Sequence, residues 1–136
     1  MRTVTPLPTD ATAASFARTF VRRVLEEWHL EPLEPDASLL ATELVTNGLR
    51  HGGGPRSLAL TRHGNRLRIA VADNEPVRSP RRQDPSLTAE GGRGLALVEG
   101  MAAAWGTSRS RLRRGKVVWC ELPILGDDRP AETTTS

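Results

Sequence analysis

Glu43 and Asn47 are the residues whose types and spacing first suggest chemistry. They stand four residues apart in a stretch with helical periodicity, so both side chains project from one face. The Asn47 carboxamide offers a neutral oxygen that suits Mg²⁺, and the Glu43 carboxylate can orient or deprotonate a hydroxyl or a water. His51 follows four residues later and can reach the same rim. The alternative for such a pair is the solvated polar face of an amphipathic helix.

Asp73 is a second candidate, because it ends an apolar strand where a charge is costly to bury without partners. A carboxylate there can accept a hydrogen bond from the exocyclic amine of adenine and thereby select the base. The alternative is an aspartate that caps a turn at the end of the strand.

A glycine-rich run is the third candidate, and it leads into a short helix that begins at Leu95. Glycines let the backbone approach a ligand closely, and a helix N-terminus directs N–H groups at an anion. Arg93 can add a charge-assisted contact to phosphate. The run matches neither the P-loop nor the G-x-G-x-x-G spacing. Its expected ligand-binding residues are Gly91, Gly92, Arg93, Gly94 and Leu95.

Helices and strands must bring these three candidates together. The patterns predict, in order, an edge strand at 2–5, helices at 12–29 and 36–50, strands at 57–62 and 66–73, a loop at 74–90, a helix at 95–104, and strands at 105–112 and 116–122. This order predicts a two-layer α/β sandwich with antiparallel strand pairs.

Apolar spacing predicts which faces are buried. The core sides of the two long helices are expected at Ala13, Phe16, Phe20, Val24 and Trp28, and at Leu39, Leu40, Leu44 and Val45. Leu67, Ile69 and Val71 are expected to share one face of their strand, and Cys120 is expected to be a small buried apolar residue.

Composition narrows the class of protein. A length of 136 residues fits one domain, placed here at 1–124, with a polar tail at 125–136. The single cysteine excludes an internal disulfide, and the net charge of +3 with three Trp and two Phe gives little support for nucleic-acid binding. Neither a membrane-spanning run nor the apolar stretch of a signal peptide is present, so a cytoplasmic protein is expected.

The three candidates in this order resemble the motifs of a known superfamily. ATELVTNGLRHG is similar to its first motif, with Glu43, Asn47 and His51 in the expected places. VADNEP, with Asp73, is similar to the second motif, and GGRGLALV is similar to the third. The chain thus resembles stand-alone histidine-kinase-like (GHKL) ATPase domains, and most closely the anti-sigma-factor serine/threonine kinases of actinobacterial regulators.

The resemblance implies a Bergerat-type ATP-binding fold, an α/β two-layer sandwich whose mixed, mostly antiparallel sheet carries helices on one face. It implies Mg²⁺-ATP as ligand, with Asn47 as the metal ligand, Glu43 as the catalytic base, Asp73 as the adenine-reading acid and residues 74–92 as a lid. It further implies a protein partner, either a sigma factor or an anti-anti-sigma protein whose serine or threonine accepts the phosphate.

One departure from the family pattern keeps a second function open. Much of the superfamily reads D-x-G in the second motif, where this chain has Asp73, Asn74 and Glu75. The alternative is therefore a nucleotide-gated binding module, an anti-sigma factor without kinase turnover. A homodimer is left open, and neither direct nucleic-acid binding nor a membrane partner is expected.

Overall fold

The computed structural model describes residues 1–51, 53–74, 98, 100–109 and 115–124. Along the chain its helices and strands are β1 (Arg2–Pro6), α1 (Ala13–Glu27), a 3₁₀ turn (Glu31–Leu33), α2 (Glu34–His51), β2 (Pro55–His63), β3 (Arg66–Asp73), β4 (Ala104–Arg109) and β5 (Lys116–Pro123). None of the helices in these ranges is both long and apolar enough to cross a bilayer.

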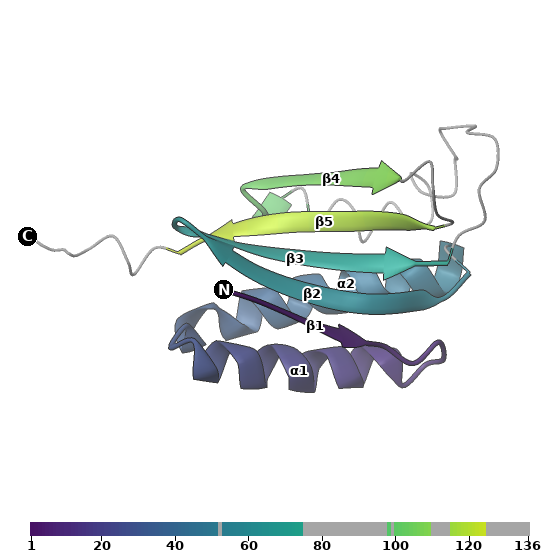
Figure 1. The fold of residues 1–136 in the computed structure, drawn as a ribbon, viewed down its shortest axis with the longest axis horizontal. Coiled ribbons are helices and arrows are strands. Elements are labelled where there is room, and N and C mark those ends of the chain that lie inside the picture. Colours follow the sequence, from purple (N-terminus) through teal and green to yellow (C-terminus); the bar gives the residue numbers. More distant parts are fainter. Residues whose placement is uncertain (52, 75–97, 99, 110–114, 125–136) are drawn as a thin grey trace, which may run out of the picture.

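The five strands form one sheet in the order β1-β2-β3-β5-β4, and every neighbouring pair is antiparallel. Helices α1 and α2 cover one face of this sheet (Figure 1). The arrangement confirms the α/β two-layer sandwich expected from the element order. It also places the N-terminal strand at one edge of the sheet and β4 at the other.

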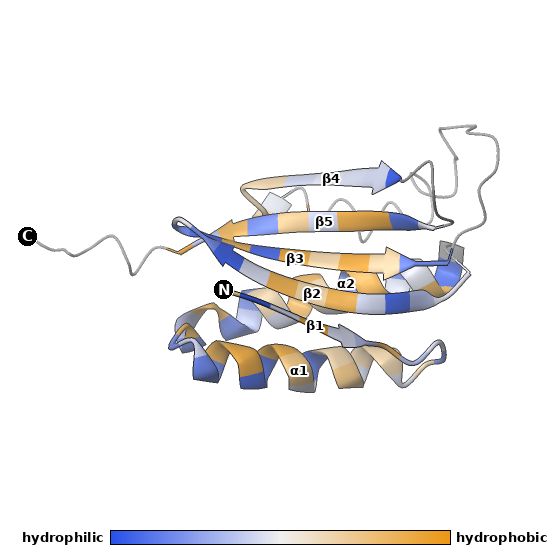
Figure 2. Ribbon diagram, in the orientation of Figure 1, coloured by the Kyte–Doolittle hydropathy of each residue, from blue (hydrophilic) through white to orange (hydrophobic). Residues whose placement is uncertain are grey.

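The core lies between the helices and the inward face of β2, β3 and β5. Alternate residues of these strands are buried, so Leu67, Ile69 and Val71 share the inward face as expected. Figure 2 shows the apolar residues of β2 and β3 in the middle of each strand and hydrophilic residues at the ends. Cys120 is fully buried among them, and burial, with the neighbouring charge of Glu121, raises the pKa of its thiol to about 12. The thiol is therefore a packing group.

Two core assignments from the helix periodicity were wrong. Phe16 is 43% exposed and Leu39 is 41% exposed. The buried stripe of α1 is centred on Val21, and Phe16 lies beyond its edge. In α2 the buried stripe follows Leu40 and Leu44. Leu39 is rotated by about 100° from Leu40 around the helix axis, away from this stripe, and therefore points toward solvent.

The short helix after the glycine run also ends earlier than expected. Val98, Gly100 and Met101 are helical, and the Ala102 N–H donates to the Val98 carbonyl at 2.8 Å. The chain then turns into β4 at Ala104, the residue to which the helix was expected to extend. Val98 is fully buried, so the described part of this helix contributes to the core.

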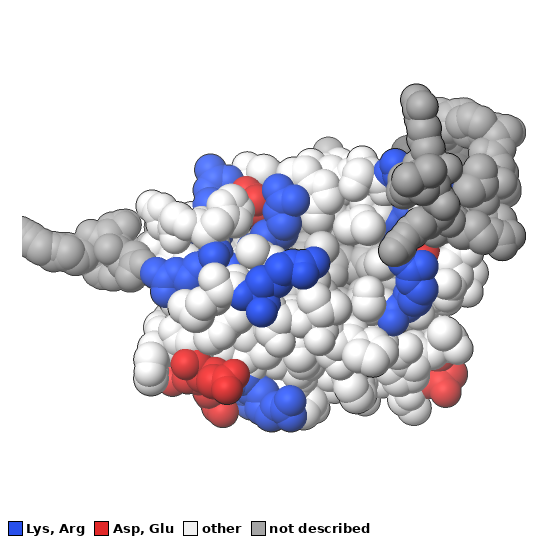
Figure 3. Space-filling view, in the orientation of Figure 1, with Lys and Arg blue, Asp and Glu red and all other residues white. Residues whose placement is uncertain are grey.

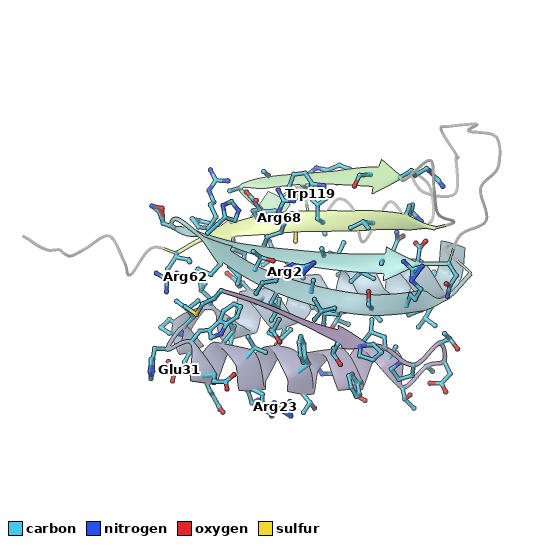
Figure 4. The ribbon with its side chains drawn as sticks, viewed as in Figure 1. Arg2, Arg23, Glu31, Arg62, Arg68 and Trp119 are labelled. Atoms are coloured by element: carbon cyan, nitrogen blue, oxygen red, sulfur yellow. The ribbon has the colours of Figure 1, made fainter. Side chains whose placement is uncertain are left out.

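The other face of the sheet carries a charged cluster centred on Glu121. This carboxylate, whose side chain is only 8% exposed, accepts hydrogen bonds from Arg66 at 3.0 Å and Arg68 at 2.9 Å and lies 3.2 Å from His63. Arg68 also lies 4.1 Å from the ring centroid of Trp119 (Figure 4). Figure 3 shows Lys and Arg side chains gathered beside a partly covered acidic side chain on this open face. The cluster therefore ties β2, β3 and β5 together from outside the core.

This cluster predicts a loss of stability in acid. Burial raises the pKa of Glu121, but the hydrogen bonds from Arg68, His63 and Arg66 outweigh it and hold this pKa below its usual range. A depressed folded-state pKa stabilises the fold above the unfolded pKa of about 4.3, and this stabilisation disappears as pH falls through the folded value. Glu121→Gln should therefore lower the free energy of unfolding by about 1–3 kcal/mol at pH 7.

Urea unfolding of the wild type and Glu121→Gln at pH 7 and at pH 3 measures this effect. The difference between the two proteins should shrink markedly at the lower pH. Glu26→Gln, which alters an exposed glutamate of α1, should show little difference at either pH. A Glu121→Gln effect that is independent of pH would contradict the electrostatic explanation.

Candidate functional site

Helix α2 carries the first pair of candidates on its C-terminal half. Asn47 is 8% exposed, and in the part of the chain that the structure describes no hydrogen bond reaches its carboxamide. Glu43, one turn earlier, is half-buried and keeps access to solvent. The helix thus places a nearly buried amide and a reachable carboxylate one turn apart.

Backbone contacts join the end of α2 to the end of β3. A methyl group on Gly48 would lie 3.6 Å from the Cβ of Asp73, so helix and strand are in direct contact there. Gly54 donates its N–H to the Gly48 carbonyl at 3.0 Å, and its own carbonyl accepts the N–H of Asn74 at 3.0 Å. The Asn74 side chain donates to the same carbonyl at 3.3 Å. The structure therefore brings the first and second motifs together.

Asp73 is fixed at this junction by a lysine. The Lys116 ammonium lies 2.7 Å from Asp73 Oδ2, and the Lys116 backbone N–H donates to Oδ1 at 3.3 Å. The Asp73 side chain is 2% exposed, and the Lys116 side chain is 3% exposed. Both residues make a further interaction as well. A carboxylate offers about four acceptor positions, so this pairing leaves room for a hydrogen bond from a ligand.

Gly115 allows β5 to start directly against the end of β3. Its φ is +95°, a region that L side chains rarely adopt, and a Cβ at this position would overlap the carbonyl oxygen of Asp73. The close approach of the two backbones sets the position of Lys116, the next residue. Gly115 is thus a structural requirement of the ion pair.

Gly115→Ala is expected to lower the free energy of unfolding by about 2–4 kcal/mol, from the disfavoured φ and the steric overlap together. Gly64→Ala is the matched control, since Gly64 has a φ of +60° but no atom within 4 Å of an added Cβ. That variant should cost about 1 kcal/mol. Chemical denaturation of the two variants measures the difference. Equal costs would contradict the close approach at Gly115.

Several of the predicted site residues lie outside the described part of the chain. His51 ends α2, but its side chain is not described. The same holds for the phosphate-binding run and for nearly all of the proposed lid, residues 75–92. The roles of Gly91, Gly92, Arg93, Gly94 and Leu95 therefore stay predictions.

The described residues offer no metal site made by protein side chains alone. No three His, Cys, Asp or Glu side chains gather as a metal site within the described ranges. A Mg²⁺ ion beside Asn47 would need phosphate oxygens and waters for most of its ligands, which is its usual mode of binding with nucleotides. The available donors are thus one amide oxygen for the cation and one carboxylate for an amine.

Sequence reasoning missed Lys116 and Gly115 as parts of the site. Their pairing with Asp73 joins positions 43 residues apart, and no local spacing reports such a contact. One signal was available. Lys116 is the only lysine in a chain whose other basic side chains are arginines, and it begins an apolar strand. A charge at that position needs a buried partner.

Comparison with protein families gives a match over most of the chain. A family model for the histidine kinase-like ATPase domain matches residues 7–121, which include α1, α2, all strands from β2 to β4, and most of β5. The matched range contains every candidate residue described above. None of the curated proteins matches the chain.

Proposed function

The chain belongs to the histidine kinase-like ATPase domain family, and from this membership we propose that it binds Mg²⁺-ATP and phosphorylates a regulatory protein on serine or threonine. The partner class is an anti-sigma-factor antagonist, with a sigma factor as a second binding partner. Support for the ligand comes from the family, and support for the kinase and its partners comes from the motif resemblance. The proposed setting is the cytoplasm.

The observation that carries the nucleotide proposal is the environment of Asn47. Asn47 is 8% exposed, and the next residue, Gly48, lies directly against Asp73 at the end of β3. The helix therefore holds a neutral oxygen ligand near the carboxylate that is proposed to read the base. The oxygen of Asn47 would bind the cation, and Asp73 would accept the amine of the base.

Glu43 is the residue proposed to act on the phosphate acceptor. When bound, Mg²⁺-ATP supplies an electrophilic γ-phosphoryl group. Glu43 is half-buried on the same face as Asn47, so its carboxylate can accept a hydrogen bond from an incoming hydroxyl. Its contribution is to orient this hydroxyl and to take up its proton.

A second function, the binding module without turnover, is favoured by one specific observation. The Asp73 carboxylate is paired with Lys116 of the same chain, at 2.7 Å and with both side chains almost fully buried. Protein groups alone thus hold this junction together, so the chain can present a folded surface to a partner. Glu75 in place of the family glycine agrees with this function.

Incubation with γ-labelled ATP and purified candidate partners distinguishes the two functions. The kinase proposal expects stoichiometric transfer of label to an anti-sigma-factor antagonist. The binding module expects a stable complex whose affinity depends on nucleotide and no label on any protein. A complex without label would overturn the kinase proposal, and labelling would overturn the module.

A further inference from the structure

The side chain next to Asp73 bears on which base the site selects. Lys116 Nζ lies 2.7 Å from Asp73 Oδ2 in a pair that is almost fully buried. This places a hydrogen-bond donor directly beside the acceptor that is proposed to read the base. An acceptor alone reads only the N6 amine of adenine and leaves the adjacent ring nitrogen N1 without a partner.

The edge of adenine carries the complementary pattern. Its N6 amine is a donor, and the adjacent ring nitrogen N1 is an acceptor. We propose that Lys116 is a second base-reading residue, whose ammonium donates to N1 while Asp73 accepts from N6. This inference rests on the proposed nucleotide binding. An ammonium has three donors, so contact with Asp73 is compatible with contact to the base.

Guanine in the same pose meets the wrong partners at both positions. Its O6, an acceptor, faces the carboxylate, and its N1–H, a donor, faces the ammonium. In a buried site each such mismatch leaves polar groups unpaired, which is why hydrogen-bonding sites reject analogues more strongly than apolar pockets do. The pair thus makes the site select adenine over guanine nucleotides.

The backbone around Lys116 is built to hold the ammonium in this place. Its own N–H donates to the other oxygen of Asp73 at 3.3 Å, and Gly115 lets the strand approach closely enough for this bond. One residue thus contacts both carboxylate oxygens, through main chain and side chain. The carboxylate and the ammonium are therefore fixed relative to each other before a base arrives.

Changing the ligand tests the inference on the wild-type protein, with no risk to the fold. Calorimetric titration with ATP, GTP and 1-deaza-ATP, which has a C–H in place of N1, gives three affinities. We expect 1-deaza-ATP and GTP each to bind about tenfold or more weakly than ATP. Equal affinities for ATP and 1-deaza-ATP would overturn the role of Lys116. No binding of ATP itself would overturn the proposed function together with this inference.

Lys116→Met completes the comparison. In this variant ATP and 1-deaza-ATP should bind equally, since the group that reads N1 is gone. Arg109→Met is the matched control, because Arg109 is the exposed residue opposite Lys116 in the β4–β5 register. It should keep the wild-type preference for ATP. A preference that survives in Lys116→Met would contradict the inference.

The single lysine also provides a spectroscopic readout. Protein labelled with ¹³C at lysine Cε should give one lysine resonance, that of Lys116. Saturating ATP should shift this resonance clearly more than 1-deaza-ATP does. An identical response to both nucleotides would overturn a contact between the ammonium and N1.

Discussion

Lys116→Met is expected to lower the free energy of unfolding by about 3–5 kcal/mol, the cost of leaving a buried charge without its partner. The reason is the position of Asp73, whose side chain is 2% exposed and whose Oδ2 lies 2.7 Å from the lysine ammonium. Without the ammonium, the carboxylate keeps its desolvation cost but loses its principal counter-charge. Urea denaturation at pH 7 measures the change.

Two comparisons make this prediction specific. Arg109→Met removes an exposed charge from the same hairpin and should change stability by less than about 0.5 kcal/mol. The double variant Asp73→Asn with Lys116→Met removes both charges and should be more stable than the sum of the single effects indicates. A Lys116→Met protein within about 1 kcal/mol of the wild type would contradict the buried ion pair.

The second large effect concerns catalysis. Glu43→Ala is expected to slow phosphoryl transfer to the partner by about 10²–10⁴-fold, the usual contribution of a positioned general base. The affinity for Mg²⁺-ATP should remain close to that of the wild type, because Asn47 and Asp73 are proposed to hold the nucleotide. Single-turnover transfer of labelled phosphate, together with calorimetric binding, separates the two quantities.

A matched control for Glu43→Ala lies in the same helix. Asp36→Ala removes an exposed acid from the first turn of α2 and should leave both transfer and binding nearly unchanged. Unchanged transfer in Glu43→Ala would remove Glu43 from the mechanism. A large loss of nucleotide binding would instead make it a binding residue.

Local patterns predicted most of the fold because helices and strands each have a characteristic spacing of apolar residues. Strand patterns identified β2 and β3 to within two residues. Helical spacing found α1 and α2 but assigned Phe16 and Leu39 to the wrong sides. A stripe of apolar residues shows that a face is buried, whereas its centre depends on the sheet against which the helix packs.

The site was predicted less completely, because it depends on contacts between distant segments. The spacing of Glu43 and Asn47 on one helix is a local property, and Asp73 at a strand end is another. The ion pair with Lys116 and the close approach at Gly115 exist only once β5 lies beside β3. The lone lysine at the start of an apolar strand indicates that a partner is needed, but no local pattern identifies Asp73 as that partner.

Asn47 is proposed to belong to a Mg²⁺-ATP site, and calorimetric titration of Mg²⁺-ATP into the wild type and Asn47→Ala tests this proposal. We expect binding to the wild type and an affinity lower by about tenfold or more in Asn47→Ala, because one metal ligand is lost. Equal affinities, or no binding to the wild type at millimolar nucleotide, would contradict it. In the second case the chain would keep the fold of the family without its ligand, and partner sequestration would become the leading function.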